Sequence, residues 1–468
     1  MENKLVYDIH DKPKFGVLLV FAFQQLLAIM AATIVVPVLV SSSAGIAAED
    51  AMSTSAALFG AGVGTLVYQL FTRFRSPVFL GSSFAFIGSM VAAFAGATAN
   101  VYLGYLGLII GAAFAGLVYV VIAAVVKIAG VGWINKLMPA AVIGPTVALI
   151  GLSLAGAAIK DVFSYGPVDD NGSYIMSGFS WVSFICAMVT LVVVTLCSTY
   201  GKKMTKLIPF IIGILAGYVV ALVFTVIGIK TGNANLIAID FNVFKALLVD
   251  GKVALSTFVA VPEFTFMNAF KGLGSFNASY LATIAVAYVP VAFVVFAEHI
   301  ADHKNLSSII DKDLLTDPGL HRTLLGDGIG SFVGAIFGGC PNTTYGESVG
   351  CVAITRNASV ATITTTAFMA IIISFISPFV AFLDSIPGCI MGGVCITLYG
   401  FIAVSGLKMI QKVDLEDNAN LFTVAAILIP GIGGMAMKIG QVTITNIACA
   451  LILGIVINLI LHAKKSAQ

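Results

Sequence analysis

The sequence is poor in charge, since Asp, Glu, Lys and Arg together make up only 10% of its 468 residues. A soluble domain carries about 25% charged residues, so this scarcity excludes an ordinary soluble protein. The seven cysteines are scattered and form no CxxC motif, so we expect neither a disulfide framework nor a cysteine metal site. The net charge is only +2 and the basic residues fall in short loops, so nucleic acid is not an expected partner.

The sequence motifs of catalysis are lacking as well. No HExxH string, Walker-type loop or nucleophile–base pair occurs within an apolar segment. The string DPGLHR contains His321, but it falls in a polar loop, where a histidine more often packs or pairs with charge than catalyses. We therefore expect no enzyme activity, no catalytic residue, no resident cofactor and no metal ion.

Long apolar segments are what the sequence does contain. Hydrophobic residues make up 59% of the chain, and the mean hydropathy is +1.05. A helix that crosses a bilayer needs about 20 apolar residues, and fourteen segments near that length fill most of the chain. The predicted spans are 15–40, 52–72, 78–96, 101–127, 137–158, 179–199, 207–229, 277–301, 323–339, 343–355, 358–383, 386–407, 419–437 and 442–462. They predict an all-α polytopic membrane protein without a separate soluble domain, and the first is too long for a signal-peptide core.

Basic residues alternate between the loops that join these spans. If the N-terminus lies in the cytoplasm, eighteen Lys and Arg residues fall on the cytoplasmic side and six fall outside. Four of those six lie in the one long loop, where the positive-inside bias is weak. The distribution predicts that both termini are cytoplasmic and that the number of spans is even.

The chain also contains an internal repeat. Residues 58–71, LFGAGVGTLVYQLF, and 324–337, LLGDGIGSFVGAIF, are identical at six of 14 positions, three of which are glycines. A short loop follows each, and then come 82–86 (SSFAF) and 343–347 (TTYGE). Chance similarity between glycine-rich apolar helices is the alternative, but two consecutive segments match in the same order. The repeats lie seven spans apart, so they cross the membrane in opposite directions, as in many secondary transporters.

Inverted repeats place the binding site near the middle of the membrane, where short or broken segments of the two halves meet. Segments 78–96 and 343–355 are the candidates, because the hydroxyl and aromatic residues at their starts favour extended backbone. Extended backbone at membrane depth must be buried in protein or line a cavity. Two such stretches can pair with each other, and the helices that follow would direct their positive N-terminal ends at the cavity.

Two acidic residues fall within predicted spans. Glu298 lies near the end of an apolar run, and Glu347 lies in the broken segment 343–355. A charged side chain at the centre of a membrane helix costs about 2.5–3.5 kcal/mol, so such residues usually serve function. The alternatives are that Glu298 sits at the interface beside Asp302 and that Glu347 bonds only to strand backbone. Asp327 is a weaker candidate, because it lies near a cytoplasmic end.

The two acids suit a ligand that has several N–H donors. Uracil offers two ring N–H groups and two carbonyls on a flat, partly apolar ring. A carboxylate can accept from an N–H group, backbone N–H groups can donate to the carbonyls, and an aromatic ring can stack on the base. Because burial disfavours a charged carboxylate, one such residue could also bind a proton.

The strings that contain these residues resemble the nucleobase–ascorbate transporter family, also called nucleobase:cation symporter-2, and within it the bacterial uracil permeases. They are FQQLLAIMAATIVVPVLV at 23–40, FLGSSFAF at 79–86, FAEHI at 296–300, DPGLHR at 317–322 and PNTTYGESVGCVAITR at 341–356. The last is the most specific, and the resemblance extends over the whole chain.

This resemblance implies a fold and a division into domains. It implies fourteen spans in two inverted seven-span repeats, with short antiparallel strands in spans 3 and 10. A core domain would comprise 15–127 and 277–383, and a gate domain would comprise 137–229 and 386–462. It also implies proton-coupled uptake of uracil, with sodium as an alternative coupling ion, and we expect any homodimer to form through the gate domains.

The resemblance also implies site residues. Glu298 and Glu347 would bind the substrate, and Phe84 would be the strand residue whose backbone contacts the base. Tyr345 and Gly346 would form the opposing strand, with Gly346 supplying a backbone N–H group. Ala32 would be a wall of the pocket.

The chain departs from uracil permeases at two positions. They often carry histidine where this chain has Asp302 and Gln25, so with Glu298 these residues are the candidates for proton coupling. A xanthine, uric acid or other purine permease is an alternative, and a seven-plus-seven anion transporter or channel is a more distant one.

Overall fold

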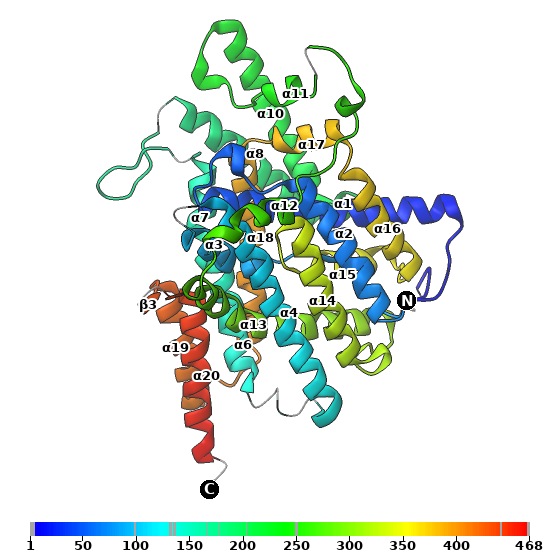
Figure 1. Ribbon diagram of the computed structural model, residues 1–468, viewed down its shortest axis with the longest axis vertical. Helices are drawn as coiled ribbons and strands as arrows, with labels where there is room; N and C mark the ends of the chain where they lie inside the picture. Colours follow the sequence, from blue (N-terminus) through cyan, green and yellow to red (C-terminus); the bar gives the residue numbers. More distant parts are fainter. Residues whose placement is uncertain are drawn as a thin grey trace. The chain divides into compact units, whose positions relative to one another are not determined.

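The computed structural model describes residues 5–97, 100–130, 133, 137–164, 166–176, 178–202, 204–248, 251–439 and 442–465. The chain is mainly helical (Figure 1) and divides into two compact units. Unit 1 comprises Met1–Ser153, Pro262–Ile371 and Ile402–Gln468, and unit 2 comprises Leu154–Val261 and Ile372–Phe401.

Unit 1 contains most of the long helices and all four described strands. Its first part holds α1 (Phe15–Ser43), η1 (Ala48–Asp50), α2 (Thr54–Phe71), β1 (Leu80–Ser82), η2 (Phe84–Phe86), α3 (Ile87–Ala95), α4 (Val101–Ala129) and α6 (Ala140–Ser153). Its middle part holds α12 (Thr265–Gly272), η5 (Leu273–Ser275), α13 (Ala278–Ile310), η6 (Leu315–Gly319), α14 (Leu320–Gly338), β2 (Asn342–Thr344), α15 (Gly346–Thr355) and most of α16 (Val360–Ile373). Its last part holds α19 (Asn418–Ile432), β3 (Met437–Ile439), β4 (Val442–Ile444) and α20 (Asn446–Lys465).

Unit 2 is built mainly from α8 and α10, which pack against each other. Its elements are α7 (Ala155–Val162), α8 (Phe179–Tyr200), α9 (Met204–Leu207), α10 (Pro209–Thr231), η3 (Ala234–Leu236), α11 (Asn242–Lys245), η4 (Leu255–Thr257), α17 (Ser377–Asp384) and the first part of α18 (Gly388–Ile410). A Cβ atom on Gly213 would lie 2.3 Å from a methyl carbon of Val194, so glycine allows the α8–α10 contact.

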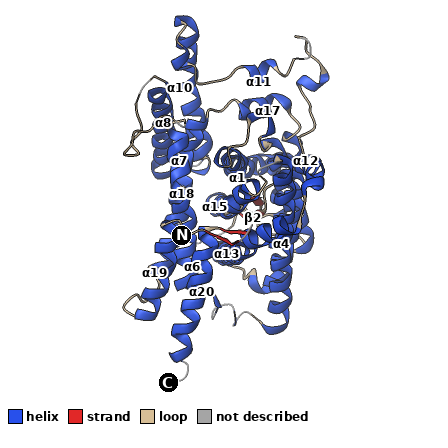
Figure 2. Cartoon of the chain, turned by 60° about the vertical axis from the view of Figure 1, so that its left-hand side comes forward, coloured by secondary structure: helices blue, strands red, loops and turns tan. Residues whose placement is uncertain are grey.

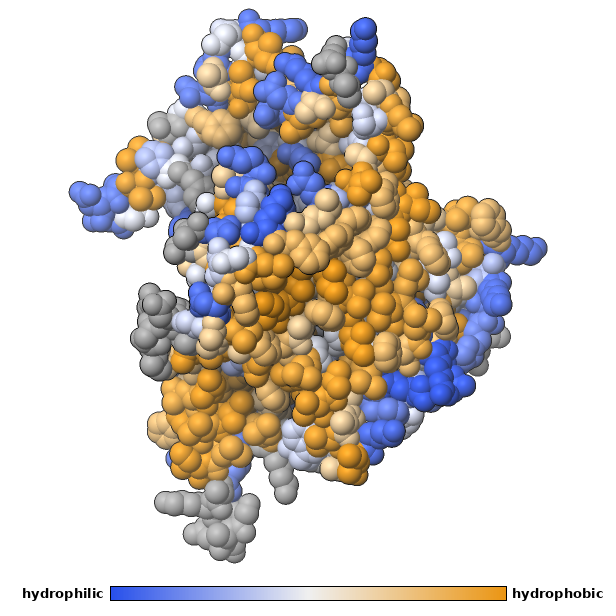
Figure 3. All heavy atoms as spheres, viewed as in Figure 1, coloured by the Kyte–Doolittle hydropathy of each residue, from blue (hydrophilic) through white to orange (hydrophobic). Residues whose placement is uncertain are grey.

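Eight helices of the described chain are long and apolar enough to cross a membrane. They lie at Phe15–Ser43, Ala48–Phe71, Val101–Ala129, Ala140–Val162, Phe179–Tyr200, Pro209–Thr231, Ala278–Ile310 and Gly388–Ile410. Four shorter apolar helices accompany them. Hydrophobic side chains form a broad surface on the face shown in Figure 3, and α4 exposes Leu117, Val121 and Ile128. An apolar surface of this kind suits lipid rather than water, so the protein is a helical, multi-pass membrane protein.

The two repeated segments became α2 and α14, and these helices pack directly against each other. A Cβ atom on Gly330 would lie 2.6 Å from the carbonyl oxygen of Gly64, which occupies the same position in the other repeat. On another side of α14, a Cβ on Gly116 of α4 would lie 2.7 Å from the carbonyl oxygen of Gly328. Only glycine permits such close backbone approach. These two glycine contacts therefore hold α14 against α2 and against α4.

The N-terminal segment runs beside the end of α15 and the start of α16. Val6 N–H donates to the Arg356 carbonyl at 2.8 Å, and the N–H groups of Ala358 and Val360 donate to the Tyr7 and Ile9 carbonyls. Ile9 is buried in a hydrophobic cluster with residues of α13 and α15. The segment is therefore an ordered part of unit 1.

Candidate functional site

The candidate site is built around a two-stranded antiparallel pair, β1 and β2. Leu80 pairs with Thr344, Gly81 with Thr343 and Ser82 with Asn342. These strands fall where the sequence predicts extended backbone, and all of their residues are buried. Figure 2 shows β2 among the helices, and it contacts α13 and α14, whereas β1 contacts α1 and α2. Segments from distant parts of the chain thus meet at one buried place.

Side chains complete the hydrogen bonding of this strand pair. The Thr65 hydroxyl accepts from the Leu80 N–H at 2.9 Å and donates to the Leu80 carbonyl at 3.2 Å. The Tyr345 hydroxyl donates to the Ser82 carbonyl at 2.8 Å, and its ring occupies the space where a Cβ on Gly81 would lie. The predicted substrate residue Tyr345 is therefore a buried brace across the two strands.

Helix α15 begins directly after β2 and has no side-chain cap. Its first residues are Gly346, which is exposed, and Glu347, which is half-buried. A Cβ on Gly346 would meet no atom within 4 Å, so there is open space at this end of the helix. The first N–H groups of a helix lack intrahelical partners and carry partial positive charge. The start of α15 thus offers N–H donors and a carboxylate side by side.

Glu298 and Asp302 lie one turn apart on the same face of α13, as residues four apart do in a helix. The Thr344 hydroxyl of β2 donates to Asp302 Oδ2 at 2.7 Å, which fixes that carboxylate at the end of the strand. Glu298 is half-buried and lies within electrostatic range of Asp302, Glu347 and Asp327. The structure therefore brings the two predicted glutamates and Asp302 into one region.

The remaining predicted residues lie on α1 and at the end of β1. Gln25 is almost fully buried and donates to Ser348 Oγ at 2.5 Å, so its amide bonds to the first turn of α15. Ala32, seven residues later on α1, has no exposed surface. Phe84 begins η2, two residues after β1 ends, and is half-buried. Phe84, Tyr345 and Gly346 are predicted on the two strands, but they lie just beyond them, because β2 ends at Thr344 and the chain then enters α15 at Gly346.

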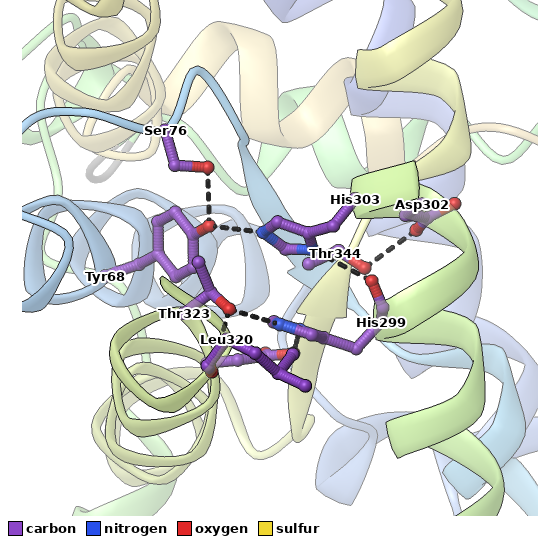
Figure 4. A network of polar contacts seen from close by, with 9 residues as sticks. Tyr68, Ser76, His299, Asp302, His303, Leu320, Thr323 and Thr344 are labelled. Carbon is purple, nitrogen blue, oxygen red and sulfur yellow. Dashed lines mark hydrogen bonds and ion pairs between the residues drawn. The ribbon is translucent and has the colours of Figure 1, made fainter. Parts of the chain in front are cut away.

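Sequence reasoning missed a polar network on the adjacent face of α13, shown in Figure 4, since consecutive residues of a helix lie about 100° apart. His299 Nδ1 lies 2.7 Å from Asp327 Oδ2, and its Nε2 lies 2.9 Å from the Thr323 hydroxyl. His303 Nε2 lies 2.8 Å from the Tyr68 hydroxyl. The two imidazole rings stack with centroids 4.1 Å apart. Helix α13 thus presents acids on one face and histidines on the adjacent face.

One signal could have pointed to this network. His299 directly follows Glu298, so it lies at the same depth of an apolar segment, where a polar side chain needs a buried partner. The sequence predicts Asp327 near the end of a span, but its side chain is fully buried. Its partner is on the preceding helix, which sequence spacing does not reveal.

The arrangement brings hydrogen-bond acceptors and donors together. Carboxylates accept hydrogen bonds from N–H groups, and the start of α15 can donate to carbonyl oxygens. Among the described residues no group of three or more His, Cys, Asp or Glu side chains is placed to hold a metal ion.

Comparison with known proteins identifies relatives of the whole chain. A xanthine/uracil permease model described as "Permease family" matches residues 16–440. The "Uracil permease" of Bacillus caldolyticus is 38% identical over 468 residues, covering 99% of this chain and 96% of that protein. The "Uracil permease" of Bacillus subtilis (strain 168) is 36% identical over 471 residues, covering 100% of this chain and 98% of that protein.

A solved structure shares the fold at much lower sequence identity. The murine "Solute Carrier 26 family member A9 (Slc26a9) anion transporter in the inward-facing state" matches with a TM-score of 0.64 and 10% identity. The match covers 97% of this chain and 69% of that one. At this identity the similarity concerns the helical membrane fold alone.

Proposed function

The chain belongs to the xanthine/uracil permease family, and we propose that it is a proton-coupled transporter that takes up uracil across the cytoplasmic membrane. The observation that carries this proposal is its similarity to proteins named "Uracil permease", at 33–38% identity over nearly the whole chain. The family consists of permeases, so the protein is a transporter and not an enzyme.

In the proposed complex, uracil lies between α13 and the start of α15. Glu298 accepts a hydrogen bond from one ring N–H group. Glu347 either accepts a hydrogen bond from the other ring N–H group or bonds to backbone N–H groups of the strand pair. The Gly346 N–H donates to a carbonyl oxygen, and the backbone of Phe84 contacts the base. Tyr345 and Ala32 act as walls. The contact between Asp302 and β2 supports this placement, because it ties the helix of Glu298 to the segment that precedes Glu347.

The proposed coupling ion is a proton. Glu298 binds it when the site faces outside, and Asp302, one turn away, modifies how readily that proton is held. Gln25 acts indirectly, through its hydrogen bond to Ser348. Release of the proton on the cytoplasmic side then weakens the site and releases uracil. Sodium is the alternative coupling ion.

We further propose fourteen spans in two inverted repeats of seven. The core domain would comprise 15–127 and 277–383, and the gate domain, a candidate dimer surface, would comprise 137–229 and 386–462. Motion of the core against the gate would move the site across the membrane. The direct packing of α2 on α14 supports this arrangement, because inverted repeats intertwine at their shared site.

Xanthine or another purine is the second candidate substrate, because the matching family model covers both xanthine and uracil permeases. The relatives at 36% and 38% identity favour uracil. An anion substrate is less well supported: the similarity to an anion transporter shows only fold, and the candidate site carries acidic rather than basic side chains.

Uptake into proteoliposomes tests the proposal. The purified protein should accumulate labelled uracil when the pH outside is lower than inside, and excess unlabelled uracil should compete more strongly than xanthine. Uptake driven by a sodium gradient without a pH gradient would show that the coupling ion is sodium and not a proton. Stronger competition by xanthine than by uracil would show that the preferred substrate is xanthine.

A further inference from the structure

The string DPGLHR, which takes no part in the candidate site, ends in the first turn of α14. Asp317 forms an ion pair with Arg75 at 3.0 Å. His321 and Arg322 follow in the first turn of the helix, and both are partly exposed. Arg322 forms no ion pair with any residue of the described chain. Its charge is therefore available to a group from outside the chain.

Helices α4 and α14 pack side by side (Figure 1) and run in opposite directions. A Cβ atom on Gly116 of α4 would lie 3.7 Å from the Cβ of Phe332. Further along α4, the Cβ of Tyr119 lies 2.7 Å from the place of a Cβ atom on Gly328. Because the later residue of α4 meets the earlier residue of α14, the end of α4 and the start of α14 lie at the same end of this helix pair.

Lys127 lies in the last turn of α4, on the side that faces α14. It follows Gly116 by about three helical turns, so the two positions differ by only about 20° around the helix axis. His321 precedes Gly328 by about two turns, so it lies on the side of α14 that faces α4. Lys127 and Arg322 are both within electrostatic range of His321. Lys127, His321 and Arg322 therefore form one group, the basic cluster.

The basic cluster has no acidic counterpart. Lys127 is exposed and, like Arg322, has no ion-pair partner in the part of the chain that the structure describes. The two charges that act on His321 are both positive. The first turn of α14 adds the partial positive charge of a helix start. A negatively charged group would relieve the repulsion between these positive charges.

An exposed apolar face of α4 begins beside the basic cluster. Leu117, Val121 and Ile128 are 57%, 54% and 86% exposed, and their spacing of four and seven residues places them on one side of the helix. Lys127 directly precedes Ile128, so positive charge and apolar surface meet at this end of α4. A ligand that fits both has a negatively charged head and hydrocarbon chains.

We propose that the basic cluster binds the phosphate headgroup of an anionic phospholipid, whose chains lie along the exposed face of α4. Basic groups between membrane helices are suited to such headgroups. Lys127 and Arg322 supply the positive charge, and His321 donates a hydrogen bond to a phosphate oxygen. Inorganic phosphate would satisfy the basic cluster but not the apolar face, so it should bind much more weakly. The inference does not depend on the identity of the transported substrate.

Lipid titration of the purified full-length protein in a nonionic detergent tests the inference. Phosphatidylglycerol should raise the thermal unfolding midpoint, whereas phosphatidylcholine with the same chains and inorganic phosphate should raise it much less. The variant Lys127→Gln/Arg322→Gln lacks both charges, so it should need about 10- to 30-fold more phosphatidylglycerol for the same rise. Lys127→Gln alone should need about 3- to 5-fold more.

Lys408→Gln/Lys412→Gln is the matched control, because both lysines are exposed and predicted to lie on the cytoplasmic side. It removes the same amount of charge elsewhere and should respond to phosphatidylglycerol as the wild type does. An equal loss of response in the two double variants would overturn the site, because it would show only a general attraction between the lipid and a positive surface. Equal protection of the wild type by phosphatidylcholine or by inorganic phosphate would overturn the anionic lipid as the ligand. If the Lys127→Gln/Arg322→Gln protein does not insert, Lys127→Gln alone, at an exposed residue, provides the comparison with the control.

Discussion

At the scale of single residues, Glu298 and Glu347 offer different groups to a ligand because they occupy different positions in their helices. Glu298 lies within a regular turn of α13, where the helix satisfies its backbone, so only its side chain is available to a ligand. Glu347 lies in the first turn of α15, where both carboxylate and N–H groups are available. A base bound between them would meet acceptors on both sides and donors on one.

Neutral replacements test this assignment. Glu347→Gln replaces a charged acceptor with a neutral amide, and hydrogen bonds to charged groups contribute about 1.5–3 kcal/mol, so we expect uracil binding to weaken by about 10- to 100-fold. Binding of labelled uracil to purified protein measures this. Glu298→Gln imitates the protonated carboxyl, so it should still bind uracil but should lose accumulation driven by a pH gradient in proteoliposomes. Both variants should still insert.

Glu416→Gln is the control for that experiment, since Glu416 is an exposed glutamate in a loop. It should bind uracil as the wild type does. Unchanged binding by Glu347→Gln, or wild-type accumulation by Glu298→Gln in a pH gradient, would contradict this assignment.

At the scale of elements, the sequence revealed the repeat and the short extended segments, because both depend on local composition. The three glycines of 58–71 and 324–337 predicted two related helices, and the hydroxyl-rich starts of the next segments predicted extended backbone. The sequence indicates that His299 needs a buried partner, but it does not identify the partners that form the histidine network. The network depends on which face of α13 meets α2 and α14, and the apolar run around Glu298 has no periodicity that distinguishes its faces.

The glycine contact between α2 and α14 gives a stability prediction. In Gly330→Ala the new methyl group would lie 2.6 Å from the Gly64 carbonyl oxygen, so the helices must separate. Overpacking typically costs about 1–3 kcal/mol, and the thermal unfolding midpoint in detergent should fall. In Gly16→Ala, the control, the methyl group meets no atom within 4 Å. An equal midpoint for both variants would contradict this account of the packing.

The N-terminal segment gives a prediction that depends on pH. Burial alone would raise the pKa of Asp8, but hydrogen bonds from Lys312 and from the Ile9 N–H hold the pKa below its usual value. A carboxyl group whose pKa is lowered in the folded state stabilises the fold at pH values above its ordinary pKa. This stabilisation is lost as the pH falls through the lowered pKa. Lys312 Nζ lies 2.5 Å from Asp8 Oδ2, and both side chains are nearly half-exposed, so solvent screens their attraction.

Asp8→Asn should therefore reduce stability at neutral pH by less than about 1 kcal/mol. The difference from the wild type should shrink below about pH 4. Unfolding midpoints of the two proteins between neutral and acidic pH measure it. A difference that grows on acidification would show that Asp8 is stabilised in its protonated form.

At the scale of the whole molecule, composition alone was enough to predict a helical membrane protein, because a charge content of 10% cannot cover a soluble surface. The number of spans is harder to obtain. Eight described helices satisfy length and hydropathy by themselves. Others, such as α14 with its Asp327, are too polar or too short alone and depend on burial by their neighbours. Hydropathy alone therefore does not identify them as membrane spans.

The position of the termini tests the fourteen-span arrangement. Eighteen basic residues fall on one side of the predicted spans and six on the other, and such a bias places the richer side in the cytoplasm. An even number of spans then puts both ends there. Epitope tags at the two termini should be inaccessible to antibody in intact spheroplasts and accessible after permeabilisation. A cysteine at Asn171, in an exposed loop predicted to lie outside, should react with an impermeant thiol reagent without permeabilisation. If one terminus were accessible in intact cells, the number of spans would be odd, and two inverted halves of seven spans each could not be present.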